Sequence, residues 1–287
     1  MSRLTACILV LSLSAATPAH ARPVGVNQWE KTFDTPGRPS LVLRTDDADV
    51  HVSTWDRHAV GLRVTTRAGS IGDRGIAVDA RQTGDRIDFE VREPHPTISF
   101  RWFSVHSVRI DVSVPRDADL DLTTGDGGVT LGAVAGAIRV RSGDGAIEAD
   151  GLRGDLRLAT SDGHIRALGL DGALEATSGD GSVEIAGRFD RLQVGTSDGR
   201  IVATALRGSR LAADWSLHSG DGSLTVRLPA DLKSELYLHT GDGSIHLGLP
   251  VETFGRFDSH TLHGRLNGGG PLLELRTGDG PIRIEAD

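Results

Sequence analysis

Apolar and polar residues alternate along most of the chain, in short runs separated by turns rich in glycine and aspartate. In the segment 156–173, Leu156 and Leu158 flank Arg157, and Ile165 follows the next turn. A period of two residues predicts short β-strands with one buried face. The density of glycines and the lack of a 3.6-residue period argue against helices. The chain is therefore predicted to be all-β.

A short motif, Thr/Ser–Gly/Ser–Asp–Gly–x–Val/Ile/Leu, recurs and marks the turns. The first four intervals between its aspartates are 18 residues each, and the next three are 23, 21 and 37 residues. A fixed short period indicates that each unit is one structural coil stacked on the previous one. The motif aspartates are Asp126, Asp144, Asp162, Asp180, Asp198, Asp221, Asp242 and Asp279.

The positions around each motif aspartate hold the same kind of residue in every coil. Large apolar residues recur six positions before and three positions after the aspartate, and apolar residues also recur four positions before it. If coils stack at the strand spacing of about 4.8 Å, these positions form continuous apolar ladders. We therefore predict a parallel β-solenoid, or β-helix, with coils of roughly 18 residues and right-handed crossovers. A meander of hairpins is the competing arrangement.

The regular coils do not fill the whole chain. After a leader, we expect a flexible lead-in at 22–39 and an N-terminal β cap at 40–118, which includes a degenerate coil near Asp47. The repeat β-solenoid is expected at 119–287, with an interruption at 251–270 that forms a covering hairpin or a further degenerate coil. Caps are expected because the ends of a solenoid expose unpaired strand edges.

The first residues have the features of a signal peptide, predicted at 1–21. Arg3 supplies a positive charge, an apolar core follows at 6–16, and Ala19-His20-Ala21 supplies small residues for cleavage. Cleavage would also remove the only cysteine, Cys7. No second hydrophobic segment follows, so no transmembrane segment is expected in the mature chain. The protein is predicted to be exported, as a periplasmic or a secreted, cell-surface protein.

Composition narrows the choice of partner. The chain has 31 Lys and Arg residues against 39 Asp and Glu residues, a formal net charge of −8, and it contains no basic run. This balance argues against nucleic acid as a partner. We expect an envelope protein or a glycan, whose identity the sequence does not specify.

Two longer segments and the repeated turns resemble a known family. The segments DVSVPRDADLDLTTGDGGV and LNGGGPLLELRTGDGPIRIE, with the SGDG and TGDG turns, are similar to the bacterial putative-adhesin β-repeat family. The resemblance covers roughly residues 40–287. It implies an exported protein of undefined biochemical function and an association with adhesion, and it brings no catalytic residues.

The aspartate column has two interpretations. In the first, each Asp accepts a hydrogen bond from a nearby backbone N–H and the following Gly adopts a positive φ, as in a tight turn. In the second, stacked carboxylates form a calcium ladder. The spacing differs from the glycine-rich nonapeptide of calcium-binding β-rolls, which favours the turn interpretation. We therefore expect no cofactor and keep calcium as the alternative.

Two histidines occupy equivalent positions in neighbouring repeats. His218 and His239 each stand three residues before a motif aspartate, so adjacent coils would place them side by side. Two imidazoles can bind zinc, but no third ligand has a suitable spacing. A surface pair is favoured, and no metal site is expected.

The sequence contains none of the motifs that usually mark a catalytic site. Some β-helix enzymes cleave acidic polysaccharides with outward carboxylates and basic groups, but they carry long loops, whereas the turns here are short. The sequence has no nucleophile elbow, no HExxH and no phosphate loop, so we expect no catalytic residues and no enzyme. The leading hypothesis is a non-catalytic envelope scaffold or adhesin-like binding module that presents long β faces to a protein or glycan. A calcium-binding repeat protein and a polysaccharide-cleaving β-helix enzyme are the alternatives.

Overall fold

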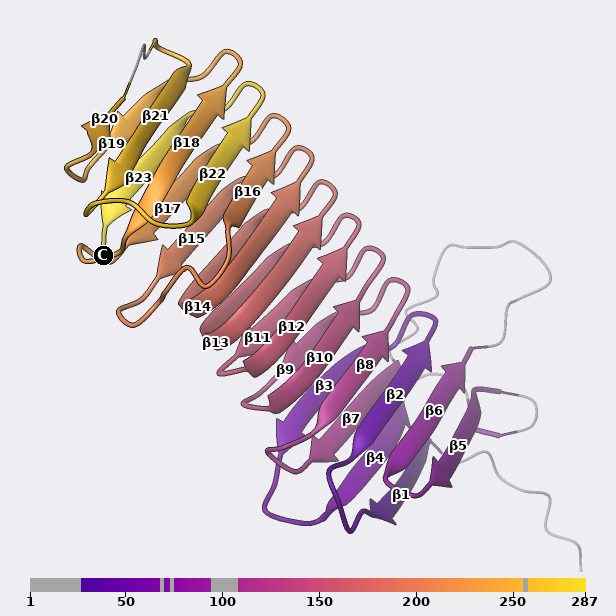
Figure 1. Ribbon diagram of the computed structural model, residues 1–287. Helices are drawn as coiled ribbons and strands as arrows, with labels where there is room; N and C mark the ends of the chain where they lie inside the picture. Colours follow the sequence, from indigo (N-terminus) through magenta and orange to yellow (C-terminus); the bar gives the residue numbers. More distant parts are fainter. Residues whose placement is uncertain (1–26, 68–69, 73–74, 94–107, 255–257) are drawn as a thin grey trace, which may run out of the picture.

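The computed structural model describes residues 27–67, 70–72, 75–93, 108–254 and 258–287. These residues form a rod of stacked coils, drawn from indigo to yellow in Figure 1. The predicted signal peptide lies outside the described residues. In the described part of the chain, no helix has the length and apolar character needed to cross a membrane.

The strands fall into two ladders, which we call sheet A and sheet B. Each regular coil contributes one strand to each sheet, and the long strands β13 (Ile165–Ser178) and β14 (Val183–Thr196) contribute to both. In spatial order, sheet A consists of β5 (Ala77–Thr83), β6 (Arg86–Arg92), β2 (Ser40–Thr45), β8 (Asp119–Thr123), β10 (Ala135–Arg141), β12 (Arg153–Thr160), the second parts of β13 and β14, β16 (Trp215–Ser219), β22 (Leu272–Thr277), β18 (Ser234–Thr240), β21 (Thr261–Leu266) and β20 (Glu252–Thr253).

Sheet B lies opposite and carries the other strand of each coil. In spatial order it consists of β1 (Gln28–Asp34), β4 (Ala59–Thr66), β7 (Val108–Val114), β3 (Asp49–Thr54), β9 (Val129–Leu131), β11 (Ile147–Asp150), the first parts of β13 and β14, β15 (Ile201–Ala205), β17 (Leu224–Leu228), β23 (Ile282–Ala286) and β19 (Ile245–Leu247).

Apolar ladders between the two sheets form the core. Ile138 pairs with Leu156, and Leu156 pairs with Leu174, in parallel register. Leu156, Leu158 and Ile165 are each 1% exposed. Stacking of identical columns buries apolar area in every coil, which is the main stabilising contribution. The prediction of a parallel β-solenoid is confirmed.

The spatial order of the coils differs from their order in the chain at both ends. Near the C-terminus, β22 lies between β16 and β18, and β23 lies between β17 and β19. Figure 1 shows the yellow β22 between the orange β16 and β18. At the other end, β2 lies between β6 and β8, and β3 lies between β7 and β9. At both ends, therefore, strands from distant parts of the chain separate the sequential neighbours.

Antiparallel strands cover both ends of the rod. At the N-terminal end, β1 pairs with β4, β4 with β7, and β5 with β6. At the C-terminal end, β21 pairs with β18 and β20 pairs with β21, so the interruption at 251–270 contains a covering hairpin.

Strand β1 contradicts the flexible lead-in expected at 22–39. Its Phe33 is 4% exposed, and its Trp29 stacks on Phe89 with the ring centroids 5.5 Å apart. The alternation in this segment is weak, because Lys31 stands in the apolar column with its ammonium over the Phe33 ring. This interruption of the apolar column explains why the sequence pattern did not predict the strand.

Candidate functional site

The motif turns form one row along the edge of the rod. Backbone N–H groups bond to carbonyls of the preceding turn, as Ser161 N–H does to Gly143 O at 2.7 Å and Gly179 N–H does to Ser161 O at 2.7 Å. The row confirms the predicted line of aspartates, although the turn of Asp279 lies between those of Asp221 and Asp242. All eight aspartates are exposed, and among the described residues their carboxylates have no hydrogen-bonded or ion-paired partner.

A buried hydroxyl holds each turn, instead of the aspartate. Thr160 accepts a hydrogen bond from Gly163 N–H at 3.2 Å, and its Oγ1 lies 2.9 Å from Gly143 O and 3.1 Å from Gly145 O in the preceding coil. The expectation that the Asp side chain accepts the turn hydrogen bond is therefore wrong. The sequence signal was present, because a Thr or Ser stands two positions before every motif Asp: Thr124, Ser142, Thr160, Ser178, Thr196, Ser219, Thr240 and Thr277.

The motif glycines are required for a different reason from the one expected. Gly163 does not adopt a positive φ. A Cβ on Gly163 would lie 2.1 Å from the carbonyl oxygen of Gly145, so only glycine permits the close approach of successive coils. The same close contact recurs along the row, for example between Gly145 and Gly127 and between Gly199 and Gly181.

His218 and His239 are not neighbours, which corrects the expected pair. Arg276 of the inserted strand β22 pairs with His218 on one side and with His239 on the other. His239 Nδ1 instead lies 3.1 Å from Thr261 Oγ1. In the described part of the chain, no group of three or more His, Cys, Asp or Glu side chains is arranged to hold a metal ion.

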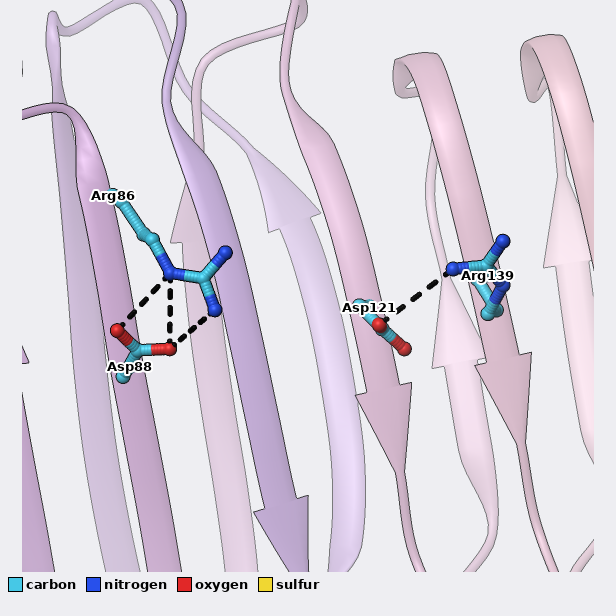
Figure 2. Close-up of polar contacts among 4 residues, drawn as sticks. All are labelled: Arg86, Asp88, Asp121 and Arg139. Carbon is cyan, nitrogen blue, oxygen red and sulfur yellow. Dashed lines mark hydrogen bonds and ion pairs between the residues drawn. The ribbon is translucent and has the colours of Figure 1, made fainter.

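Charged side chains gather on the outward face of sheet A near its N-terminal end (Figure 2). Arg86 lies 2.7 Å from Asp88, and Arg139 lies 3.8 Å from Asp121, around a hollow of about 200 Å³ over Val42. The Arg86 guanidinium donates hydrogen bonds to Asp88 and holds the pKa of that carboxyl below its ordinary value. The charges are paired and partly exposed, so each pair contributes little energy and the hollow offers no unpaired charge of one sign.

A second hollow, which we call the aromatic groove, lies on the same face at the C-terminal end. Its volume is about 520 Å³. On neighbouring strands, Glu274 pairs with Tyr237, Tyr237 pairs with His263, and Phe254 N–H donates to His263 O at 3.0 Å. The other side chains that line the groove are Glu235, Leu236, Leu272 and Arg276.

Contacts among its own side chains order the groove. The His263 ring lies edge-on to Tyr237, with the centroids 4.8 Å apart. The guanidinium of Arg276 lies 4.8 Å from the Tyr237 centroid and 2.6 Å from Glu274. Stacked and ion-paired side chains have already lost much of their rotamer freedom, so a ligand that binds them loses less entropy.

Beside the groove, Arg265 and Glu252 repeat this arrangement on the Phe254 ring. The guanidinium of Arg265 lies 4.7 Å from the Phe254 centroid and 2.6 Å from Glu252. Phe254 is 45% exposed, and the only other exposed large apolar residue in the described part is Leu206, at 38%. The groove therefore combines an accessible aromatic ring with two fixed planar guanidinium groups.

Comparison with known proteins places this architecture in a family. Residues 39–285 match the family model described as Toastrack DUF4097. The chain belongs to this Toastrack family. The predicted membership in a β-repeat family of undefined function is thereby confirmed. No curated protein matches the chain.

Solved structures also resemble this Toastrack chain. A putative lipid binding protein from Parabacteroides distasonis is 16% identical with a TM-score of 0.45, over 90% of this chain and 96% of that chain. A putative adhesin from Parabacteroides merdae is 10% identical with a TM-score of 0.44, over 90% of this chain and 96% of that chain. A putative cell adhesion protein from Clostridium sporogenes is 9% identical with a TM-score of 0.27, over 91% of this chain and 99% of that chain.

The aromatic groove of the Toastrack chain was not predicted from its sequence. Its strands become neighbours only because β22 is inserted beside β18 and because β21 and β20 run antiparallel to their partners. The one available signal was composition: Tyr237 is the only tyrosine, in a chain with 4% aromatic residues.

Proposed function

We propose that this Toastrack chain is a non-catalytic binding module of the bacterial envelope and that the aromatic groove is its binding site. One observation carries the proposal. The outward face of sheet A gathers Tyr237, His263 and the exposed Phe254 in a single concave strip, beside guanidinium groups that are already fixed. Concave sites with an apolar floor and a few ordered polar groups are the usual form of ligand sites.

Two carboxyl groups have pKa values shifted away from the range that a general acid needs, which supports a binding role. A general acid that works near neutral pH needs a raised carboxyl pKa. Arg86 holds the pKa of Asp88 below its ordinary value, and the backbone N–H groups of His260 and Thr261 do the same for Asp258. Glu274 in the groove and Glu252 beside it form ion pairs with arginines at 2.6 Å.

The location in the envelope rests on the predicted signal peptide at 1–21 and on the rod itself. A rod of stacked coils presents long, regular faces that are suited to an extended polymer. Export would bring these faces to the periplasm or the cell surface, where such polymers lie.

The test measures binding of the purified protein to isolated bacterial envelope material by co-sedimentation. We expect saturable binding, weakened at least tenfold by Phe254→Ala and by Arg276→Gln. The matched control is Leu206→Ala, which removes the other exposed apolar side chain and lies outside the groove. Thermal melts verify that each variant is folded.

Two results would contradict the proposed function. Equal binding by Phe254→Ala and Leu206→Ala would remove the groove from the binding site. New reducing ends or unsaturated products after incubation with envelope polysaccharide, lost on substitution of one outward carboxylate, would make the protein an enzyme.

A further inference from the structure

We infer that the ligand of the aromatic groove is a neutral glycan, a chain of uncharged pyranose sugars lying across strands β18, β21 and β20. This inference rests on the proposed function and names its ligand. The strip that would hold the glycan consists of Tyr237, His263 and Phe254, which follow one another on the outward side of these strands.

The spacing of the strip suits a sugar chain. Neighbouring strands lie about 4.8 Å apart, close to the advance of one pyranose unit in an extended glycan. Tyr237 and His263 are direct cross-strand partners, and Phe254, immediately after β20, donates its N–H to His263 O. A glycan that runs parallel to the rod axis therefore meets one ring for each sugar unit.

The chemistry of the walls matches sugar hydroxyls. Aromatic rings pack against the apolar C–H faces of pyranoses, as they do against other apolar groups. Guanidinium and carboxylate groups are planar and offer two parallel donors or acceptors, which fits pairs of adjacent hydroxyls. The pairs Arg276–Glu274 and Arg265–Glu252, both at 2.6 Å, hold these groups in place beside the rings.

The charge of the groove favours an uncharged polymer over an acidic one. Two arginines, Arg265 and Arg276, stand against three carboxylates, Glu235, Glu252 and Glu274. Each arginine is already ion-paired, so neither offers a free positive charge to a uronate or a phosphate. Sites for polyanions need an excess of unpaired positive charge.

The apolar area is too small for a typical protein interface. Interfaces between proteins are built around a buried cluster of large side chains within a wider desolvated patch. Phe254 is the one large apolar side chain of the groove that is exposed, and Tyr237 is half-buried. A glycan needs only such narrow contacts, and a protein ligand is a distinct outcome of the test.

The experiment treats the same envelope material in two ways before binding is measured. Protease digestion destroys protein ligands, whereas periodate cleaves the adjacent hydroxyl pairs of glycans. We expect binding to survive protease and to be lost after periodate. Neutral polysaccharide, purified from that material as the fraction that does not bind an anion exchanger, should compete fully, whereas the acidic fraction should not.

Substitutions of groove residues test whether the neutral glycan binds in the aromatic groove. Affinity for the neutral fraction, measured by affinity electrophoresis, should fall at least tenfold in Phe254→Ala and in Tyr237→Ala. It should fall at least fivefold in Arg276→Lys, which keeps the charge and loses the planar fork. Leu206→Ala should bind normally.

The outcomes separate this inference from the proposed function. Groove-dependent binding that is lost after protease and survives periodate would overturn the glycan and leave the binding module intact. Competition by the acidic fraction alone would overturn the neutral ligand. Absence of any groove-dependent binding to envelope material would overturn the proposed function itself.

Discussion

Gly163 faces the carbonyl oxygen of Gly145 in the preceding coil so closely that a Cβ atom on Gly163 would lie 2.1 Å from that oxygen. Real Cβ atoms do not approach an oxygen to this distance, so the two coils would have to separate. The turn glycine therefore sets the distance between coils along one edge of the rod, and the same close contact is repeated from turn to turn.

Gly163→Ala should lower the free energy of unfolding by about 3 kcal/mol, the upper range for an inserted methyl group, because the obstacle is backbone that cannot rotate away. Denaturant unfolding followed by circular dichroism measures the change. Gly195→Ala is the control, since its Cβ would meet only Thr177 Cγ2 at 3.8 Å and its φ is not positive. We expect Gly195→Ala to be neutral or slightly stabilising, and similar losses in both variants would contradict this account.

Thr160→Val should cost about 1–3 kcal/mol although it keeps the shape of the side chain. The substitution leaves Gly163 N–H without its acceptor and removes the hydroxyl that lies 3.1 Å from Gly145 O. The matched control is Thr177→Val on an exposed position of β13, expected to stay within about 0.5 kcal/mol of the parent. If Thr160→Val were as mild as the control, the hydroxyl row would have no part in stability.

Asp162→Ala should change stability by less than about 0.5 kcal/mol, because the carboxylate is exposed and no partner is found for it in the described part of the chain. For the same reason, millimolar calcium should leave the melting temperature of the parent protein unchanged. A calcium ladder predicts the opposite, since a ligand at a hundred times its Kd adds about 2.7 kcal/mol to the native state. A rise of several degrees, abolished in Asp162→Ala, would establish the ladder.

Arg86→Gln should raise the pKa of Asp88 towards its ordinary value, because the hydrogen bonds from Arg86 are the main cause of its lowered pKa. A carboxyl whose pKa is lowered in the folded state stabilises that state above its unfolded pKa and loses this effect as the pH falls through the folded pKa. NMR titration of Asp88 between pH 6 and pH 2 measures the shift. Asp258, held by backbone N–H groups, should titrate identically in parent and variant.

Leu275→Ala should accelerate hydrogen exchange in β16 and in β18 alike. Leu275 is fully buried and pairs with Leu217 on one side and with Leu238 on the other. Loss of a buried leucine side chain costs about 2–5 kcal/mol, which loosens both neighbours. Exchange that increases only in β18 would show that the inserted coil does not support β16.

The periodic part of the fold is readable from sequence, because each coil repeats the same contacts with its neighbours. Leu156 and Ile165 reveal their burial through the two-residue period and the 18-residue register. The spatial order of the coils cannot be predicted from this pattern. The column pattern of Leu236, Leu273 and their equivalents is the same in every coil, so it does not specify which coil lies beside which.

The candidate site depends on that missing information. Tyr237, Phe254 and Arg276 become neighbours through an inserted coil and an antiparallel hairpin, and no local pattern encodes either. The role of Thr160 could have been predicted, because a Thr or Ser recurs at its position in the motif. The error there was one of chemistry: either the hydroxyl or the carboxylate could accept the turn hydrogen bond, and only burial distinguishes them.

The insertion of β22 and β23 also sets an order of events during synthesis of the chain. Strands β18 to β21 emerge before the segment that separates them from β16 and β17, so a gap with two open edges persists until residues 272–286 arrive. At this end of the rod, the coils therefore cannot be added one at a time in the order in which they are synthesised. A chain that lacks that segment would expose unpaired strand edges to proteases, whereas the complete chain closes the gap and covers them.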